Sequence, residues 1–219
     1  MGPNLAQVLN TLAHEIRTPL AVSQGYLKLY LDGLLKTPDD QRAALQKARE
    51  ALGQISTLCA DMGRVSALSQ APHAPLTESI TVGRMVASLK TAPELGGATW
   101  RGELASPGAL AASSFTDLVR AVAAVACAAF DEASEAQRVF SVEAADASTL
   151  TLLAGAEGSV AALRTGPEDA KAEPFDLFRG GKGLTLIWAS FVLQQHRVRT
   201  WNHRDHRASV GFRFPLVQV

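Results

Sequence analysis

The sequence predicts an α-helical hairpin followed by an α+β domain built as a two-layer sandwich, and three observations predict this. Apolar residues recur at steps of three and four over most of the N-terminal third, as on one face of a helix. A proline-containing segment, residues 71–75, then interrupts the pattern. Beyond it, short apolar runs alternate with turn residues and helical stretches, which is typical of helices packed on a mixed sheet. We therefore expect domains at residues 1–70 and 76–219.

The hairpin consists of two long predicted helices. The first follows the apolar positions from Leu5 to Leu34. Thr37 then suits an N-cap and Pro38 the first helical position, with acidic residues in the following turn. A heptad-like seam marks the second helix: Leu45, Ala48, Leu52, Ile55, Cys59 and Met62. Because each helix is about 45 Å long and would leave its apolar stripe exposed, we expect a homodimer whose hairpins form a four-helix bundle.

The α+β domain is predicted element by element from the remaining pattern. The first expected elements are a short strand and helix over Ser79–Leu89 and an alanine-rich helix over Phe115–Ala133. Strands follow at Val139–Val142 and Leu150–Leu153, with a turn around Asp146 between them. The last expected elements are a helix over Leu184–Gln195 and strands at Arg197–Trp201 and Ser209–Pro215, joined by a turn over Asn202–Arg207.

Composition excludes several classes of function. Lys plus Arg and Asp plus Glu both number 21, so the net charge is zero and nothing favours nucleic acid as a partner. Cys59 and Cys127 lie far apart, which argues against a disulfide framework or a zinc site and fits the cytoplasm. Both are expected to pack in cores. The longest apolar stretch, Leu118–Phe130, is too short to span a membrane and contains Arg120.

Seven consecutive residues, His14–Leu20, form the most specific motif of the chain. Leu12 and Ile16 belong to the apolar stripe, so His14, two positions from each, is expected to face solvent. An imidazole that is unprotonated near neutral pH can attack phosphorus with a ring nitrogen. The motif resembles the phosphorylation-site box of histidine kinases, in which this histidine is the phospho-acceptor. The alternative is a surface histidine on a helix that merely tolerates its proline.

The resemblance implies roles for three neighbours of the histidine. Glu15 would accept a hydrogen bond from the imidazole and raise its nucleophilicity. Thr18, four residues after His14 and on the same helical face, would help to hold a water that hydrolyses the aspartyl phosphate of a response-regulator receiver domain. Pro19 would bend the helix just past the site.

The second half of the chain resembles the ATP-binding domain of this family only in outline. Ala124 and Ala128 stand where asparagines belong, and alanine can neither coordinate magnesium nor contact phosphates. In the first glycine box, residues 154–158, Ala154 replaces the aspartate that would select adenine, and Ala156 replaces a glycine. We interpret the remaining glycines there as a turn at the sheet edge.

The second glycine box is partly preserved before the predicted helix at Leu184. Gly181 and Gly183 are the remaining candidates for phosphate binding, since glycines ahead of a helix N-terminus can cradle an anion. Phe175–Arg179 resembles the phenylalanine-rich box, yet only Gly180 and Gly181 separate it from the glycine box, so the usual lid over ATP is missing. We expect a structural remnant without ATP, magnesium or another metal, with residual anion binding as the alternative.

Other aromatic and histidine residues have simpler interpretations. Trp188, Phe191 and Trp201 are expected in the core rather than as a base-stacking platform. A second group, His196, His203 and His206, is expected in a solvated turn, with anion binding as the alternative.

The leading hypothesis is a signalling protein that exchanges phosphate with a receiver domain at His14, or dephosphorylates it, without using ATP. A divergent but active ATP-dependent sensor histidine kinase is the alternative. A further alternative is a non-catalytic dimeric regulatory module.

Overall fold

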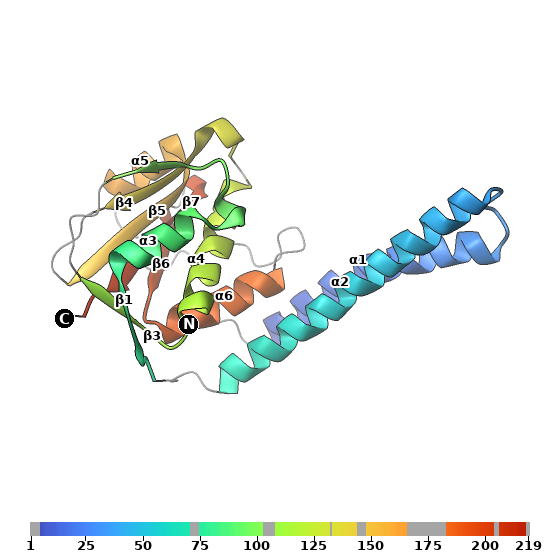
Figure 1. Cartoon of the computed structure of the whole chain (residues 1–219), viewed down its shortest axis with the longest axis horizontal. Helices are drawn as coiled ribbons and strands as arrows, with labels where there is room; N and C mark the ends of the chain where they lie inside the picture. The colour runs from blue at the N-terminus through green and yellow to red at the C-terminus, as the bar shows by residue number, and fades with distance from the viewer. Residues whose placement is uncertain are drawn as a thin grey trace. The chain divides into compact units, whose positions relative to one another are not determined.

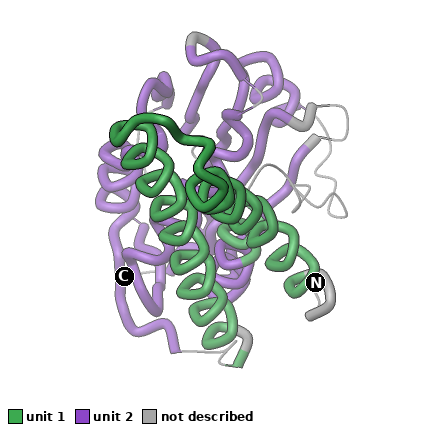
Figure 2. The backbone as a smooth tube through the Cα atoms, turned by 90° about the vertical axis from the view of Figure 1, so that its right-hand side faces the viewer, with its two compact units in different colours: residues 1, 3–70, 177–187 green, residues 2, 71–176, 188–219 purple. Residues whose placement is uncertain are grey.

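The computed structural model describes residues 5–70, 75–102, 108–131, 133–143, 148–165, 183–203 and 206–217. The chain divides into two compact units (Figure 2). Unit 1 comprises residues 1, 3–70 and 177–187, and unit 2 comprises residues 2, 71–176 and 188–219. Helix α6 (Gly183–Gln195) crosses the division, with its first turn in unit 1 and the remainder in unit 2.

Unit 1 contains the predicted helical hairpin, formed by α1 (Leu5–Leu31) and α2 (Pro38–Gln70) (Figure 1). Thr37 caps α2 as expected: its Oγ1 accepts from the Asp40 amide at 3.1 Å, and its hydroxyl donates to Asp40 Oδ2 at 2.7 Å. The first helix is shorter than predicted, because Gly33 adopts φ +67° and the Leu34 amide turns back to the Leu29 carbonyl at 3.2 Å. This is a Schellman ending, so Leu34 lies outside α1.

Within one chain the two helices pack through small side chains. The buried residues are Val8, Thr11, Pro19, Ser23, Ala44, Ala48, Ala51 and Val65. Many large apolar side chains of the predicted stripes remain 38–79% exposed: Leu9, Leu20, Leu27, Leu31, Leu34, Leu45 and Leu52. Cys59 is also exposed, so the single chain does not bury it in a core. The hairpin alone therefore leaves most of its leucine surface uncovered.

Unit 2 contains a mixed five-stranded sheet in the order β2-β4-β5-β7-β6. Its strands are β2 (Thr99–Arg101), β4 (Arg138–Glu143), β5 (Thr149–Ala156), β6 (Arg199–His203) and β7 (His206–Pro215). Among the strand pairs described for this sheet, β2–β4 alone is parallel. A separate antiparallel pair joins β1 (Glu78–Thr81) to β3 (Ala109–Ala112). The helices of this unit are α3 (Val82–Lys90), α4 (Phe115–Phe130), α5 (Glu157–Thr165) and most of α6, with 3₁₀ turns η1 (Pro93–Leu95) and η2 (Glu135–Gln137).

The predicted hairpin and α+β domain are thus confirmed, and the sheet is mixed as expected. Helix α5 was not predicted. Its Val160 and Leu163 pack in one core cluster with Leu153 and Trp201. Because neighbouring strand residues point to opposite faces, Leu152 points to the other face of the sheet. The predicted turn around Asp146 falls outside the described residues.

Gly155 corrects the interpretation of the first glycine box as a turn at the sheet edge. It lies inside β5, which is paired with β4 on one side and with β7 on the other. Its φ is +149°, and a Cβ there would lie 2.2 Å from the carbonyl oxygen of Ala208. The glycine is required by the close approach of β7, and Gly158 of the same box lies in the first turn of α5.

Candidate functional site

His14 and Thr18 lie on one exposed side of α1, four residues apart. The exposure of His14 is as predicted, whereas its two neighbours in the apolar stripe, Leu12 and Ile16, are half-buried. Pro19 is buried, and the helix continues through it to Leu31. The imidazole is thus open to solvent and to a partner molecule.

Glu15 is half-buried and has a partner that the sequence did not predict. Its Oε1 accepts a hydrogen bond of 3.2 Å from the amide of Leu184, which also belongs to unit 1. Its Oε2 is buried and has no hydrogen-bond partner among the residues that the structure describes. The carboxyl group thus caps the N-terminus of α6, where free amides favour an anion. No sequence pattern could show this pairing, because the two residues are 169 positions apart.

Burial raises the pKa of the Glu15 carboxyl above its ordinary value. The amides of Leu184 and Gly183 and the positive charge of His14 act in the opposite direction, while the negative charge of Asp61 adds to the rise. The candidate base of the motif is therefore held in a partly desolvated place, next to an exposed histidine.

Of the two glycines proposed for phosphate binding, only one can be located. Gly183 is buried and begins α6. Gly181 lies outside the described residues, as does the phenylalanine-rich segment 175–179.

The two positions at which the family has asparagines carry alanine methyl groups in this chain. Ala124 and Ala128 are half-buried on α4, one turn apart. Arg120, one turn before Ala124, is exposed and lies over the Trp188 ring, 5.3 Å from its centroid. Ala154 is completely buried in β5, paired with Phe140 of β4. Across the described ranges, no group of three or more His, Cys, Asp or Glu side chains could hold a metal ion.

A shallow cavity of about 460 Å³ lies beside the first glycine box. It is lined by Gln137, Ala156, Glu157, Gly158 and Ser159. Glu157, the acidic residue of this lining, already forms an exposed ion pair with Arg101. The sequence did not predict this pair, because it joins a sheet strand to the start of the unpredicted α5.

His196 is buried rather than part of a solvated turn, which corrects the sequence interpretation. It is only 3% exposed. Its Nδ1 lies 2.7 Å from the Val192 carbonyl oxygen, and its Nε2 accepts from the Ser113 amide at 3.1 Å. The side chains of its two proposed neighbours, at positions 203 and 206, lie outside the described set.

The predicted core positions of the tryptophans are confirmed. Trp188 is 7% exposed and Trp201 is 3% exposed, and Phe191 is half-buried. Cys127, expected in a core, is half-buried on α4. No described helix is both long enough and apolar enough to cross a bilayer.

Comparison with known proteins agrees with this architecture. Residues 4–70 match the family model of the His Kinase A (phospho-acceptor) domain. Among solved structures, the histidine kinase AdeS of Acinetobacter baumannii is 19% identical, with 93% of this chain and 96% of that chain covered and a TM-score of 0.56. Full-length ShkA in complex with AMPPNP is 20% identical, and its TM-score is 0.48. That match covers 96% of this chain and 46% of the ShkA chain, so this chain spans less than half of ShkA. No curated protein sequence matches the chain.

The family match covers the hairpin and the whole His14–Leu20 motif, while the likeness to AdeS extends over both units. At this level of identity the likeness to AdeS concerns the fold. Residues 4–70 therefore match the His Kinase A phospho-acceptor domain, and the chain has a fold similar to that of the histidine kinase AdeS.

Proposed function

We propose that the chain is a histidine phosphotransfer protein that exchanges a phosphoryl group with a response-regulator receiver domain at His14 and does not itself use ATP. One combined observation carries this proposal. The phospho-acceptor motif is intact and His14 is exposed, whereas the positions expected to hold magnesium, phosphate and adenine are Ala124, Ala128 and the buried Ala154. An exposed histidine needs no nucleotide if a receiver supplies the phosphate.

The proposed step is an exchange of one bond for another at phosphorus. The unprotonated ring nitrogen of His14 attacks the phosphorus of the receiver's aspartyl phosphate, a nitrogen–phosphorus bond forms, and the aspartate leaves as a carboxylate. The other ring nitrogen then carries a proton that a neighbouring base can accept. In the proposal this base is Glu15, after it leaves the Leu184 amide. The reverse sequence returns the phosphate to the receiver.

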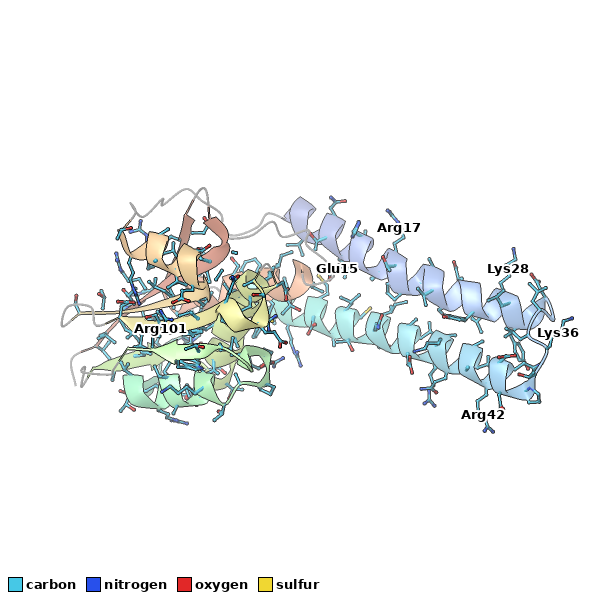
Figure 3. The ribbon with its side chains drawn as sticks, turned by 90° about the horizontal axis from the view of Figure 1, so that it is seen from above. Glu15, Arg17, Lys28, Lys36, Arg42 and Arg101 are labelled. Atoms are coloured by element: carbon cyan, nitrogen blue, oxygen red, sulfur yellow. The ribbon has the colours of Figure 1, made fainter. Side chains whose placement is uncertain are left out.

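The surface around His14 supports a protein partner. Thr18 and Val22 follow it at four-residue steps, and both are exposed, Val22 by 42%. Leu29, seven residues beyond Val22, is 38% exposed on the same side of α1. Arg17 and Lys28 point away from α2 (Figure 3). An apolar face with basic residues beside it suits a partner whose reactive group is a phosphorylated carboxylate.

The uncovered leucines support a homodimer as part of the proposal. They lie on both helices, including Leu20 and Leu27 of α1 and Leu45 and Leu52 of α2. Each pair is spaced by seven residues, as in a helical bundle seam. A second copy of the hairpin would bury them in a four-helix bundle.

Dephosphorylation of the receiver is a second, related activity that we propose for the same site. It would require a water beside Thr18 to attack the aspartyl phosphate in place of His14. The exposed position of Thr18, on the same side of the helix as His14, supports it.

An altered mode of ATP use is the second candidate function. The cavity of about 460 Å³ beside the first glycine box favours it, whereas the start of α6 at Gly183 is buried and already capped by Glu15. Phosphoryl transfer from ATP depends mainly on positioning and on metal-assisted charge stabilisation. The alanines on α4 supply neither, so we rank this function below phosphotransfer. A regulatory module without phosphoryl chemistry is the third candidate.

The test uses the full chain and a panel of receiver domains labelled beforehand with a radioactive small-molecule phosphodonor. We expect label to move from at least one receiver to the chain as acid-labile, base-stable phosphohistidine, and His14→Gln to remove it. Calorimetry with Mg-ATP to millimolar concentration should show no binding. Saturable ATP binding with label on His14 would make the chain a kinase. Full signalling activity of His14→Gln would favour the regulatory module.

A further inference from the structure

The hydrogen bonds of His196 fix the protonation state of its ring. A carbonyl oxygen only accepts, so the 2.7 Å contact with Val192 requires a hydrogen on Nδ1. An amide only donates, so the 3.1 Å bond from Ser113 requires a lone pair on Nε2. The ring is therefore neutral with its hydrogen on Nδ1. The side chain is 3% exposed, and burial lowers its pKa below the ordinary value.

The two bonds join two helices at their ends. Val192 lies in the last turn of α6, which His196 directly follows. Ser113 directly precedes Ser114, the N-cap of α4, whose Oγ accepts from the Asp117 amide at 3.3 Å. Helix α4 carries the two alanines that stand where the family has asparagines, and α6 begins at Gly183 of the second glycine box, so His196 connects these two helices.

The turn after α6 is held in an unfavourable conformation next to this histidine. Arg197 adopts φ +57°, in the left-handed region that favours glycine, and the Val198 amide donates back to the Leu193 carbonyl at 2.8 Å. Such a conformation persists only where neighbouring bonds hold it. The anchoring of His196 to Ser113 is one such bond.

We propose that His196 is an acid-sensitive clasp between the C-terminal turn of α6 and the start of α4, closed when the imidazole is neutral and opened when it is protonated. A proton on Nε2 would face the Ser113 amide hydrogen, and the hydrogen bond from this amide to Nε2 would be lost. The Ser113 hydroxyl, 3.3 Å from Nε2, offers the protonated ring an alternative acceptor. The start of α4 would then lose its tie to α6.

The charged groups around the ring set how easily it takes up a proton. Asp117, in the first turn of α4, and Glu78 of β1 both raise the pKa of His196, but burial outweighs them. Glu78 lies close because its strand partner is Ala112, next to Ser113. The pair Ser113–His196 is not a nucleophile with its base, since the Nε2 lone pair already accepts the amide hydrogen of Ser113. The clasp is independent of the chemistry at His14.

The direction of the pH effect follows from the lowered pKa. The unfolded chain takes up a proton on this histidine near the ordinary value of 6.5, whereas the folded chain takes it up only at lower pH. Between these values the unfolded state binds more protons. The contribution of His196 to stability is therefore complete above 6.5 and is lost as the pH falls through this window.

Nitrogen-detected imidazole NMR and amide hydrogen exchange on the full wild-type chain test the clasp. We expect the Nδ1–H form of His196 at neutral pH. On its protonation, exchange at the Ser113 amide should accelerate by about fivefold relative to its intrinsic rate, the equivalent of one hydrogen bond. An Nε2–H form, or Ser113 exchange that does not follow the titration of His196, would overturn the proposal.

Denaturation of a variant gives a second readout. In His196→Asn, the side-chain amide can still donate toward Val192 but cannot titrate. The wild type should lose stability relative to this variant on acidification from pH 7.5. Equal profiles for wild type and His196→Asn would contradict the clasp, and failure of that variant to fold would leave the NMR experiment as the deciding one.

Discussion

Gly211 of β7 lies directly against the indole ring of Trp201 on β6, its partner in the strand pairing. A Cβ at position 211 would lie 2.3 Å from two carbons of the ring. The glycine thus creates the space that the tryptophan fills, and the ring continues into the cluster with Leu153 and α5. Trp201 serves as core, with no room beside Gly211 for a stacked base.

Gly211→Ala is therefore expected to destabilise unit 2. The added methyl group must displace the buried ring, and overpacking of this kind costs about 1–3 kcal/mol in the free energy of unfolding. Chemical denaturation followed by tryptophan fluorescence measures the loss. Gly83→Ala in α3 is the matched control, because its Cβ would meet nothing within 4 Å. That control should be neutral or stabilising by up to about 1 kcal/mol, and equal behaviour of the two variants would contradict the packing argument.

Ala154→Asp is expected to destabilise the chain rather than restore an adenine site. Ala154 has no exposed surface, so the new carboxyl group would be buried in the middle of β5. We expect a loss of more than about 3 kcal/mol, the usual consequence of an unpaired buried charge. Ala128→Asn, at a half-buried position of α4, should cost much less. A stable Ala154→Asp variant that binds Mg-ATP would show that the first glycine box is still open to nucleotide.

The sequence was sufficient to predict the hairpin, its capping by Thr37 and the exposure of His14, because these depend on local periodicity and on neighbouring residues. It did not predict α5, whose small residues Gly158 and Ser159 resemble a turn. The predictions of a turn at the sheet edge for Gly155 and of a solvated turn for His196 were also wrong. Both environments depend on strands or helices that are distant in the sequence, and no local pattern encodes the approach of β7 or of Ser113.

The predicted leucine stripes showed that each helix has an apolar side, but they did not show which residues are buried within one chain. Periodicity showed that both helices have an apolar side, yet the face buried within one chain consists of small residues such as Ala44 and Ala48. Composition along a helix does not distinguish the surface that meets the other helix of the hairpin from the surface that the hairpin leaves exposed. The exposed fractions of the leucines make this distinction.

Thr18→Ala is expected to separate two activities at the proposed site. Removal of the hydroxyl should slow receiver dephosphorylation by about tenfold or more, since positioned groups of this kind contribute at least that much. Transfer of phosphate to His14 should remain, because Thr18 does not supply the attacking nitrogen. The assay follows labelled receiver and labelled chain in parallel. Thr91→Ala, which removes an exposed hydroxyl from the end of α3, is the control. Loss of both activities in Thr18→Ala would point instead to a docking role.

Leu27→Asp is expected to convert the proposed dimer to monomers. Leu27 is 38% exposed in the single chain and lies on the same stripe as Leu20. Burial of a leucine contributes about 1.5–3 kcal/mol per copy, and a dimer would lose two such contacts and gain two desolvated carboxylates. Analytical ultracentrifugation over a range of concentrations measures the result. Gln24→Asp, at an exposed polar position of α1, should leave the association unchanged. A wild-type chain that sediments as a monomer would rule out the bundle.

Glu15→Gln is expected to change how stability depends on pH. The raised pKa of Glu15 means that the folded chain binds this proton more tightly than the unfolded chain, whose value is near 4.5. Stability from this group is therefore greatest at low pH and declines as the pH rises above 4.5. Wild type should lose stability over this range relative to Glu15→Gln, which keeps a neutral side chain.

Glu50 provides the control of opposite sign for this measurement. Hydrogen bonds from Gln46 and Lys47 lower the pKa of its exposed carboxyl, so its contribution is present above 4.5 and is lost on acidification. Wild type should thus gain stability with rising pH relative to Glu50→Gln, while it loses stability relative to Glu15→Gln. Denaturant titrations at a series of pH values measure both differences. The same sign for both would show that Glu15 is not held in the desolvated site beside Leu184.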